Sequence, residues 1–384
     1  MACRDKFIEQ VGRRFQILAV YTCDWSPENW AWNLARFYGG RSMVGTTKLR
    51  EIGFSPFLAV IVRDDAPIYG PVQALGGNVD VANRNIIDFK FHLRLEASAN
   101  FCHSTSSRSE FLMQSTLLLG LEEASRLQHI SDWDGAVSML RGDIEGAESW
   151  ECFERMVGYL NRTCRWLVLR NFENLPDSLT EENDLDVLTD DMELFSAIAG
   201  LVPRSGGLGH YTASISGEQI SIDVRCLGDG YYPTLWEVDL LETRTWCDNA
   251  IPKPEPVHHF FSLLYHARLQ KPSMSDRYVT VLTDLALQIR FDDVAEETLR
   301  DDVRSASILS GFMKSRLYPV TRPVDYGVFW NRRFQRLLSG FEMVSPRVLR
   351  KRRVLCFMRR WLPNWVYQVV PYRLRVTIKT KLNH

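Results

Sequence analysis

The chain has 384 residues, of which 45% are hydrophobic and 24% are charged, and this composition excludes a disordered or fibrous protein. No apolar run reaches the roughly 18 residues of a membrane-spanning helix, and the first residues do not lead into a signal-peptide core. The eight cysteines form no Cys-x-x-Cys pair, which argues against a structural zinc site or a disulfide framework and favours a reducing cytoplasm.

Two breaks divide the chain. A polar, Asp- and Gly-rich connection over 130–148, with a short helical piece at 136–140, and a Pro-rich stretch over 251–256 are typical of domain boundaries. We therefore expect an α+β fold with an N-terminal α/β domain, a central domain, a helical domain and a basic aromatic tail. Their predicted bounds are 1–145, 146–250, 251–344 and 345–384.

In the N-terminal domain, apolar runs at 15–21 and 57–62 predict buried strands, and helical spacing predicts a helix over 110–127. The segment from Asn100 to Ser107 precedes this helix and contains His103 among hydroxyl residues. Such a segment can bind phosphate at the unpaired amides of a helix N-terminus. The alternative is a helix N-cap beside a partly buried histidine.

This segment resembles the active-site region of nucleoside diphosphate kinases, which reads Asn-x-x-His-Gly-Ser-Asp-Ser. Matching positions hold Asn100, His103, Thr105 and Ser107. Ser104 and Ser106 replace the glycine and the aspartate of that pattern. The resemblance covers this segment alone and implies a phosphate-binding or phosphate-accepting role for His103.

The central domain is organised around an acidic stretch at 181–191. We predict a strand there, preceded by a helix at 147–162 and a strand at 166–169. Side chains alternate along a strand, so Asp184 and Asp186 share one face while Leu185 and Val187 are buried on the other. Paired carboxylates repel each other unless a cation neutralises them, and Mg²⁺ is the usual cation. The alternative is a solvated acidic loop that caps the next helix.

A β-hairpin follows at 210–215 and 218–225, with Asp223 in its second strand beside Arg225. This order of elements over 147–245 resembles the polymerase-β-type nucleotidyltransferase superfamily. The resemblance implies a five-stranded mixed sheet in a nucleotidyltransferase-like domain. It also implies that Asp184, Asp186 and Asp223 are catalytic and hold two Mg²⁺, which bind a nucleoside triphosphate and activate an attacking hydroxyl.

The chain departs from that family at Arg170 and Asn171, where the family usually has Gly-Ser or Gly-Gly. Arg170, Asn171 and Arg225 could contact nucleotide phosphates through hydrogen bonds. Loss of the glycine instead favours a non-catalytic member of the fold.

Further candidates for contact with the substrate lie beyond the hairpin. Asp229 and Tyr231 stand in a turn near the predicted site, and a tight turn explains them equally well. The resemblance implies that the helical domain contacts the base or the acceptor. The candidates there are Tyr265, His266 and Lys271, which a plain helix end would also explain.

The tail combines charge with aromatic residues. Residues 345–384 contain eleven Lys or Arg and no Asp or Glu, so the rest of the chain is acidic. Basic residues interleaved with Trp, Leu and Val suit an anionic membrane surface. Nucleic acid and packing on the acidic body are the alternatives.

Together these features predict a Mg²⁺-dependent nucleotidyl- or phosphoryl-transferase, cytoplasmic and peripheral on the inner membrane face. Surface-polysaccharide or lipid-linked glycan synthesis is the setting that the tail suggests. The alternatives are a non-catalytic binding or scaffold protein on a degenerate nucleotidyltransferase fold, and a nucleic-acid-modifying nucleotidyltransferase.

Overall fold

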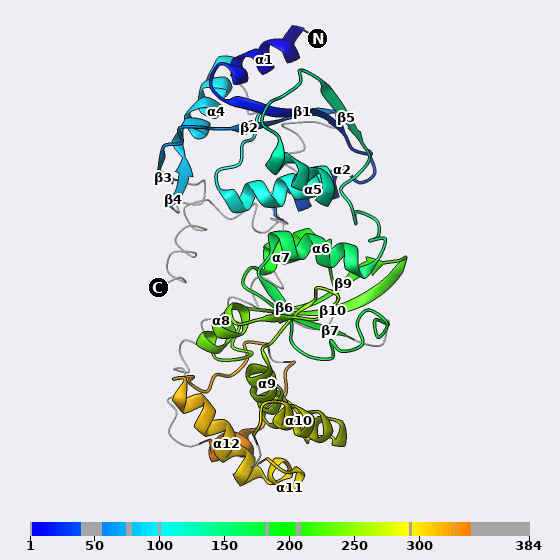
Figure 1. Cartoon of the computed structure of the whole chain (residues 1–384), viewed down its shortest axis with the longest axis vertical. Coiled ribbons are helices and arrows are strands. Elements are labelled where there is room, and N and C mark those ends of the chain that lie inside the picture. Colours follow the sequence, from blue (N-terminus) through cyan, green and yellow to red (C-terminus); the bar gives the residue numbers. More distant parts are fainter. Residues whose placement is uncertain are drawn as a thin grey trace, which may run out of the picture.

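The computed structural model arranges the helices and strands in three regions along the longest axis of the molecule, in the order of the sequence (Figure 1). The predicted tail at 345–384 and Asn100 of the predicted phosphate-binding segment lie outside the described residues. The described ranges are 2–39, 56–73, 79–98, 101–180, 184–204, 209–291, 294–325 and 327–338.

The N-terminal region is built on a three-stranded sheet in the order β2-β1-β5, in which β1 is antiparallel to β2 and parallel to β5. Its elements are α1 (Ala2–Gly12), β1 (Gln16–Asp24), α2 (Trp30–Phe37), β2 (Phe57–Arg63), β3 (Tyr69–Gln73), β4 (Val79–Asn83), α4 (Arg84–Ala97), α5 (Arg108–Arg126), a 3-10 turn (Leu127–His129) and β5 (Val137–Arg141). The two predicted strands and the predicted helix are confirmed.

The predicted helical piece at 136–140 is wrong, because this segment is strand β5. Val137 pairs with Val20 of β1, far away in the sequence. A five-residue apolar segment carries little helical preference of its own, so the open edge of β1 decides its conformation.

The central region contains a five-stranded mixed sheet in the order β6-β7-β10-β9-β8, as the resemblance implied. Strands β7 and β10 are parallel neighbours in its middle, and β10 forms the predicted hairpin with β9. Its elements are α6 (Phe153–Thr163), β6 (Trp166–Val168), β7 (Leu185–Thr189), α7 (Met192–Ala199), β8 (Val202–Pro203), β9 (His210–Ile215), β10 (Glu218–Cys226), α8 (Thr234–Glu242), β11 (Thr245–Trp246) and β12 (Pro252–Lys253).

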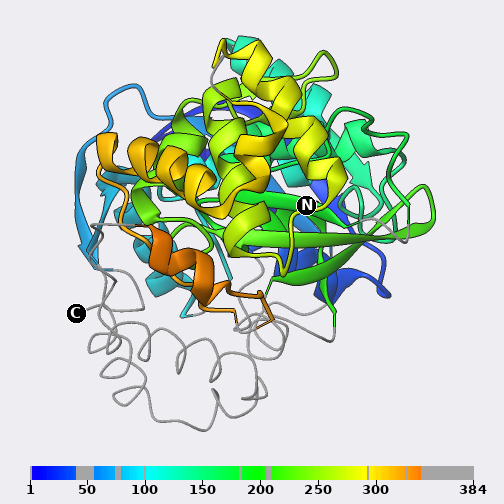
Figure 2. The ribbon, with the colours of Figure 1, turned by 90° about the horizontal axis from the view of Figure 1, so that it is seen from below.

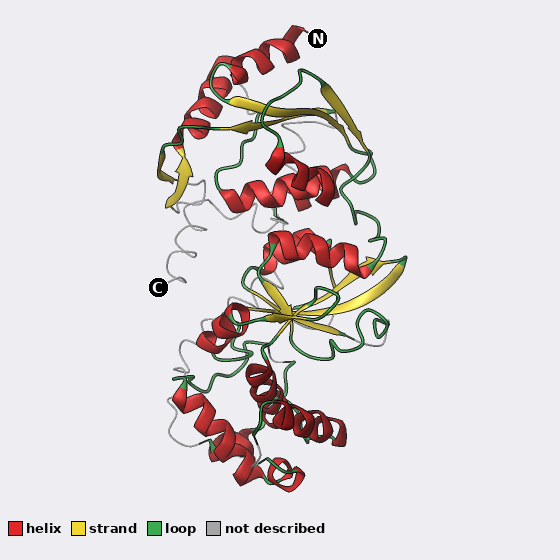
Figure 3. Ribbon diagram, viewed as in Figure 1, coloured by secondary structure: helices red, strands yellow, loops and turns green. Residues whose placement is uncertain are grey.

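The C-terminal region is helical. It contains α9 (Pro256–Leu269), α10 (Asp276–Gln288), α11 (Glu296–Arg300), α12 (Asp302–Ser315) and α13 (Arg332–Leu337). Helix α9 is buried over most of its length because other elements pack around it, and Figure 2 shows these helices stacked on one face of the central sheet. The predicted α+β class is therefore confirmed (Figure 3).

The central sheet is buried on both faces. Val187 points into a hydrophobic cluster that includes α6, α7 and apolar residues of the N-terminal region. Its neighbour Leu188 points into a second cluster that includes α8, α9 and the C-terminal helices. Among the described residues, no helix is both long and apolar enough to cross a membrane. The three regions thus share their cores, and the central sheet stands between them.

Candidate functional site: a carboxylate pocket on the central sheet

A pocket of about 340 Å³ lies where β7 begins, and all three predicted carboxylates line it. Asp186 of β7 is the direct partner of Asp223 in the parallel ladder with β10. Asp184 comes just before β7, two residues from Asp186, so alternation gives both carboxylates access to the same pocket. Leu185 and Val187 are buried in the core, as predicted.

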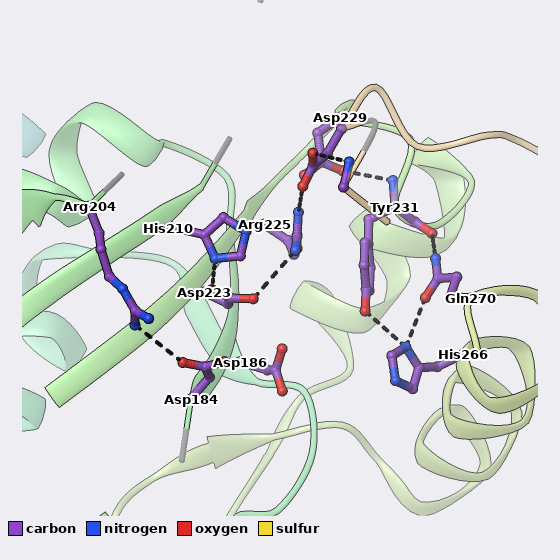
Figure 4. Close-up of polar contacts among 12 residues, drawn as sticks. Asp184, Asp186, Arg204, His210, Asp223, Arg225, Asp229, Tyr231, His266 and Gln270 are labelled. Atoms are coloured by element: carbon purple, nitrogen blue, oxygen red, sulfur yellow. Dashed lines mark hydrogen bonds and ion pairs between the residues drawn. The ribbon is translucent and has the colours of Figure 1, made fainter. Parts of the chain in front are cut away.

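Each of these carboxylates faces a cationic side chain, as Figure 4 shows for Asp184 and Asp223. Oδ1 of Asp184 lies 3.8 Å from Nη1 of Arg204. Oδ1 of Asp223 lies 2.5 Å from Nδ1 of His210, and Oδ2 of Asp223 lies 3.5 Å from Nη2 of Arg225.

Asp186 accepts a hydrogen bond from Arg170 Nη2, and Arg225 also pairs with Asp325 at 3.0 Å. The strands therefore concentrate negative charge at one place, and neighbouring cations balance it.

The electrostatics of Asp223 show how crowded this negative charge is. Burial raises the pKa of Asp223, the charges of Arg225 and His210 lower it, and those of Asp186 and Asp184 raise it again. The net result is a pKa above the ordinary value of an aspartate. An additional cation near these groups would favour the ionised form of Asp223.

The donor set fits a hard divalent cation, because all three predicted ligands are carboxylates. They form no ready-made cage, since no group of three His, Cys, Asp or Glu within the described ranges is arranged to hold a metal ion.

Positively charged side chains from the C-terminal region also line the pocket. Lys271 lies just after α9, and Arg277 and Tyr278 lie in the first turn of α10. The other lining residues are Arg170, Asn171, Glu173, Asn174, Leu175, Ser178, Leu179 and Leu185. Lys271 was predicted, whereas Arg277 and Tyr278 were missed. A cation in the first turn of a helix is unfavourable against the helix dipole, and this signal could have drawn attention to Arg277.

Arg170 and Asn171 line the pocket, but other protein groups already contact their side chains. Arg170 uses Nη2 on Asp186 and Nη1 on the Tyr231 hydroxyl, 3.1 Å away. Asn171 has a φ of 59°, a left-handed conformation that glycine adopts most easily and asparagine tolerates. Its Oδ1 accepts a hydrogen bond from Arg277. The backbone therefore keeps a glycine-like conformation although the residue type differs.

Two of the predicted substrate residues are structural in their observed contacts. Asp229 accepts hydrogen bonds from the backbone amides of Cys226 and Tyr231, which makes it the organiser of a tight turn. Tyr265 is fully buried and its hydroxyl donates to the carbonyl of Thr321. Neither belongs to the lining of the pocket. The contacts of Asp229 match the turn alternative, whereas Tyr265 lies buried within α9.

Tyr231 and His266 lie directly behind the pocket. The Tyr231 hydroxyl is 2.9 Å from His266 Nδ1 (Figure 4). His266 Nε2 is 3.1 Å from the hydroxyl of Tyr278, which lines the pocket. Burial lowers the pKa of His266 well below its usual value, and the charges of Arg170 and Lys271 lower it further. His266 is therefore neutral and supports the wall of the pocket rather than contacting a ligand.

His103 belongs to the N-terminal region and is not part of this pocket. Its Nε2 is 3.0 Å from Gln114 Oε1 and its ring packs against Tyr38. Ser107 caps α5 by accepting a hydrogen bond from the amide of Glu110. The capping part of the alternative is thus observed, while a phosphate role for His103 stays a prediction.

Comparison of the chain with protein-family models, with curated proteins and with solved structures finds no significant match. Any function assigned to the pocket therefore rests on its own residues and geometry.

Proposed function

We propose that the chain is a divalent-cation-dependent nucleotidyl- or phosphoryl-transferase on a polymerase-β-type nucleotidyltransferase fold. One observation carries the proposal: Asp186 and Asp223, paired in neighbouring strands, share a single pocket with Lys271 and Arg277. The carboxylates suit a metal ion, and the cations in the same pocket suit phosphate oxygens.

The order of strands supports the fold part of the proposal. The Asp-x-Asp strand β7 lies between β6 and β10, and the third carboxylate comes from β10, as the resemblance implied. The left-handed Asn171 supports it too, because the loop after β6 keeps the conformation for which a glycine would be used.

The chain's own residues have separate tasks in this proposal. Asp184, Asp186 and Asp223 would hold Mg²⁺, which when bound polarises phosphoryl oxygens and lowers the pKa of an attacking hydroxyl. Lys271 and Arg277, which line the same pocket, bind the oxygens of the polyphosphate. His210 and Arg225 orient Asp223 through their ion pairs.

The test is a calorimetric titration of the full chain with Mg-ATP, Mg-CTP, Mg-GTP and Mg-UTP. Binding of at least one nucleotide is expected, with loss of binding in EDTA and in Asp223→Asn. Asp177→Asn is the matched control, because it removes the same charge from an exposed position in the loop after β6 that does not line the pocket. Absence of heat with all four nucleotides in the wild-type protein would sink the proposal.

A second candidate is a nucleotide-binding protein without turnover, and the ion pair between Arg170 and Asp186 favours it. A guanidinium already neutralises a carboxylate that a catalytic metal would need. Release of phosphate or pyrophosphate from the bound nucleotide separates the two candidates. Binding without any release over many hours, whatever hydroxyl acceptors are supplied, would favour the second.

A further inference from the structure

Arg170 is fixed in the pocket rather than free to swing. It follows β6, its side chain is 11% exposed, and its two terminal nitrogens donate to Asp186 and to the Tyr231 hydroxyl. Burial is the largest single influence on Arg170 and lowers its pKa, but the charge of Asp186 and the neighbouring tyrosines together outweigh burial, so the net shift of the pKa is upward. The guanidinium of Arg170 therefore stays charged, and its two hydrogen bonds fix its position in the pocket.

The residues behind Arg170 hold it there. The Tyr231 ring packs against two guanidinium groups, with Arg225 4.7 Å and Arg170 5.9 Å from its centroid. The Tyr231 hydroxyl contacts His266, and the Tyr231 carbonyl accepts a hydrogen bond of 2.6 Å from Gln270. Because this backing is buried and packed, moving Arg170 would break several contacts at once.

The positive charge is distributed unevenly over the three carboxylates. Asp186 forms an ion pair with Arg170, and Asp223 forms ion pairs with Arg225 and His210. Asp184 is the weakly matched member, since its side chain is 52% exposed and Arg204 lies 3.8 Å away with a side chain as exposed as its own. Exposed pairs of this kind contribute little, typically about 0–1 kcal/mol. The Asp184 side is therefore open to a further cation, because this carboxylate is half exposed and its ion pair with Arg204 is long.

We propose that Arg170 takes the place of one of two divalent cations, so that the pocket binds a single divalent cation on the Asp184 side together with the polyphosphate. This inference rests on the proposed function and sharpens it. The guanidinium supplies a fixed positive charge beside Asp186, and one metal ion completes the neutralisation that the carboxylates and the polyphosphate require.

Native mass spectrometry of the full chain with Mn²⁺ and tripolyphosphate counts the metal directly, without any need for turnover. The wild-type complex with tripolyphosphate is expected to carry one Mn²⁺, and Arg170→Gln is expected to carry two. Arg204→Gln is the matched control, because it removes a cation beside Asp184 and should leave the count at one.

A wild-type complex with two Mn²⁺, or an Arg170→Gln complex that still carries one, would overturn the inference and leave the proposed function intact. A wild-type complex without Mn²⁺, or no tripolyphosphate complex at all, would overturn both. If Arg170→Gln does not fold, the wild-type count still decides the question, and Arg170→Lys, which keeps the charge, should carry one Mn²⁺.

Discussion

Two carboxylates in different regions, the partly buried Asp143 and the buried Asp186, are stabilised in different ways. In the N-terminal region, Asp143 accepts hydrogen bonds from the neutral side chains of Ser26, Asn29 and Asn33. Burial works against its charge, but these hydrogen bonds together lower the pKa of Asp143. In the central region, Asp186 is instead held by the guanidinium of Arg170.

The difference separates a carboxylate with structural contacts alone from one to which the proposal gives a function. Three neutral donors satisfy Asp143 completely enough that it ties the loop after β5 to α2 and needs nothing more. The carboxylates of the central pocket stand too close together for neutral donors to stabilise them, so they collect cations. The proposed function assigns to this cluster of carboxylates and cations the binding of a charged ligand.

The largest expected effect separates the two kinds of carboxylate. Asp184→Asn should lower the rate of nucleotide turnover by about 10²–10³-fold, since it removes charge from the reacting centre. The free energy of unfolding should change little, because Asp184 is half exposed. Steady-state kinetics and urea unfolding measure the two quantities.

We expect Asp143→Asn to have the opposite pattern of effects to Asp184→Asn. It should reduce the free energy of unfolding by about 2–3 kcal/mol, the value of hydrogen bonds to a charged group, and leave the rate of turnover unchanged. Equal losses of stability in both variants, or an equal loss of turnover in both, would contradict the different roles given to Asp143 and Asp184.

Arg36 tests whether the two regions form one cooperative unit. This fully buried arginine of α2 donates to the carbonyls of Ala197 and Ile198 at the end of α7 and to that of Glu145. Arg36→Leu leaves these acceptors without their donors and should cost about 3 kcal/mol. Urea unfolding followed by tryptophan fluorescence and by circular dichroism should show coincident transitions in the wild type. Transitions that already separate in the wild type would contradict the shared core.

A pair of buried acids behind the pocket predicts a dependence of stability on pH. Burial raises the pKa of Glu237 well above its usual value, and the neighbouring Asp229 raises it further. The folded state thus keeps a proton that the unfolded state releases above a pH of about 4.5, so stability should fall as pH rises from there towards the folded pKa. The slope should approach about 1.4 kcal/mol per pH unit.

Glu237→Gln, a neutral mimic of the protonated acid, should flatten this slope. Urea unfolding at a series of pH values provides the measurement. An unchanged slope in Glu237→Gln would mean that another group binds the proton.

The smallest expected effect concerns Asn171. Asn171→Gly should change stability by less than about 1 kcal/mol, because glycine favours the left-handed conformation but loses the side-chain hydrogen bond from Arg277. Asn171→Val should cost about 1–3 kcal/mol, since a β-branched residue is strained there. Thermal unfolding compares the two, and equal stability would contradict the role given to this conformation.

Local patterns allowed much of the central region to be predicted. Alternation along β7 and β10 identified the buried faces and the carboxylates, and the turn at Ser216 and Gly217 identified the hairpin. These features depend on residues that are near in sequence, and periodicity reports them faithfully.

The missed features depend on contacts between distant segments. Strand β5 needs β1 as its partner, and Arg277 reaches the pocket because α10 packs behind Asn171. Arg170 appeared available for phosphate because its contacts with Asp186 and Tyr231 cross from one element to another. No local pattern encodes such pairings.

Anomalous diffraction from crystals grown with Mn²⁺ and polyphosphate shows whether the carboxylates of β7 and β10 bind a divalent cation. We expect an anomalous peak within bonding distance of Asp184 and at least one of Asp186 and Asp223. A pocket without a peak, although Mn²⁺ and polyphosphate are present at saturating concentrations, would contradict this expectation.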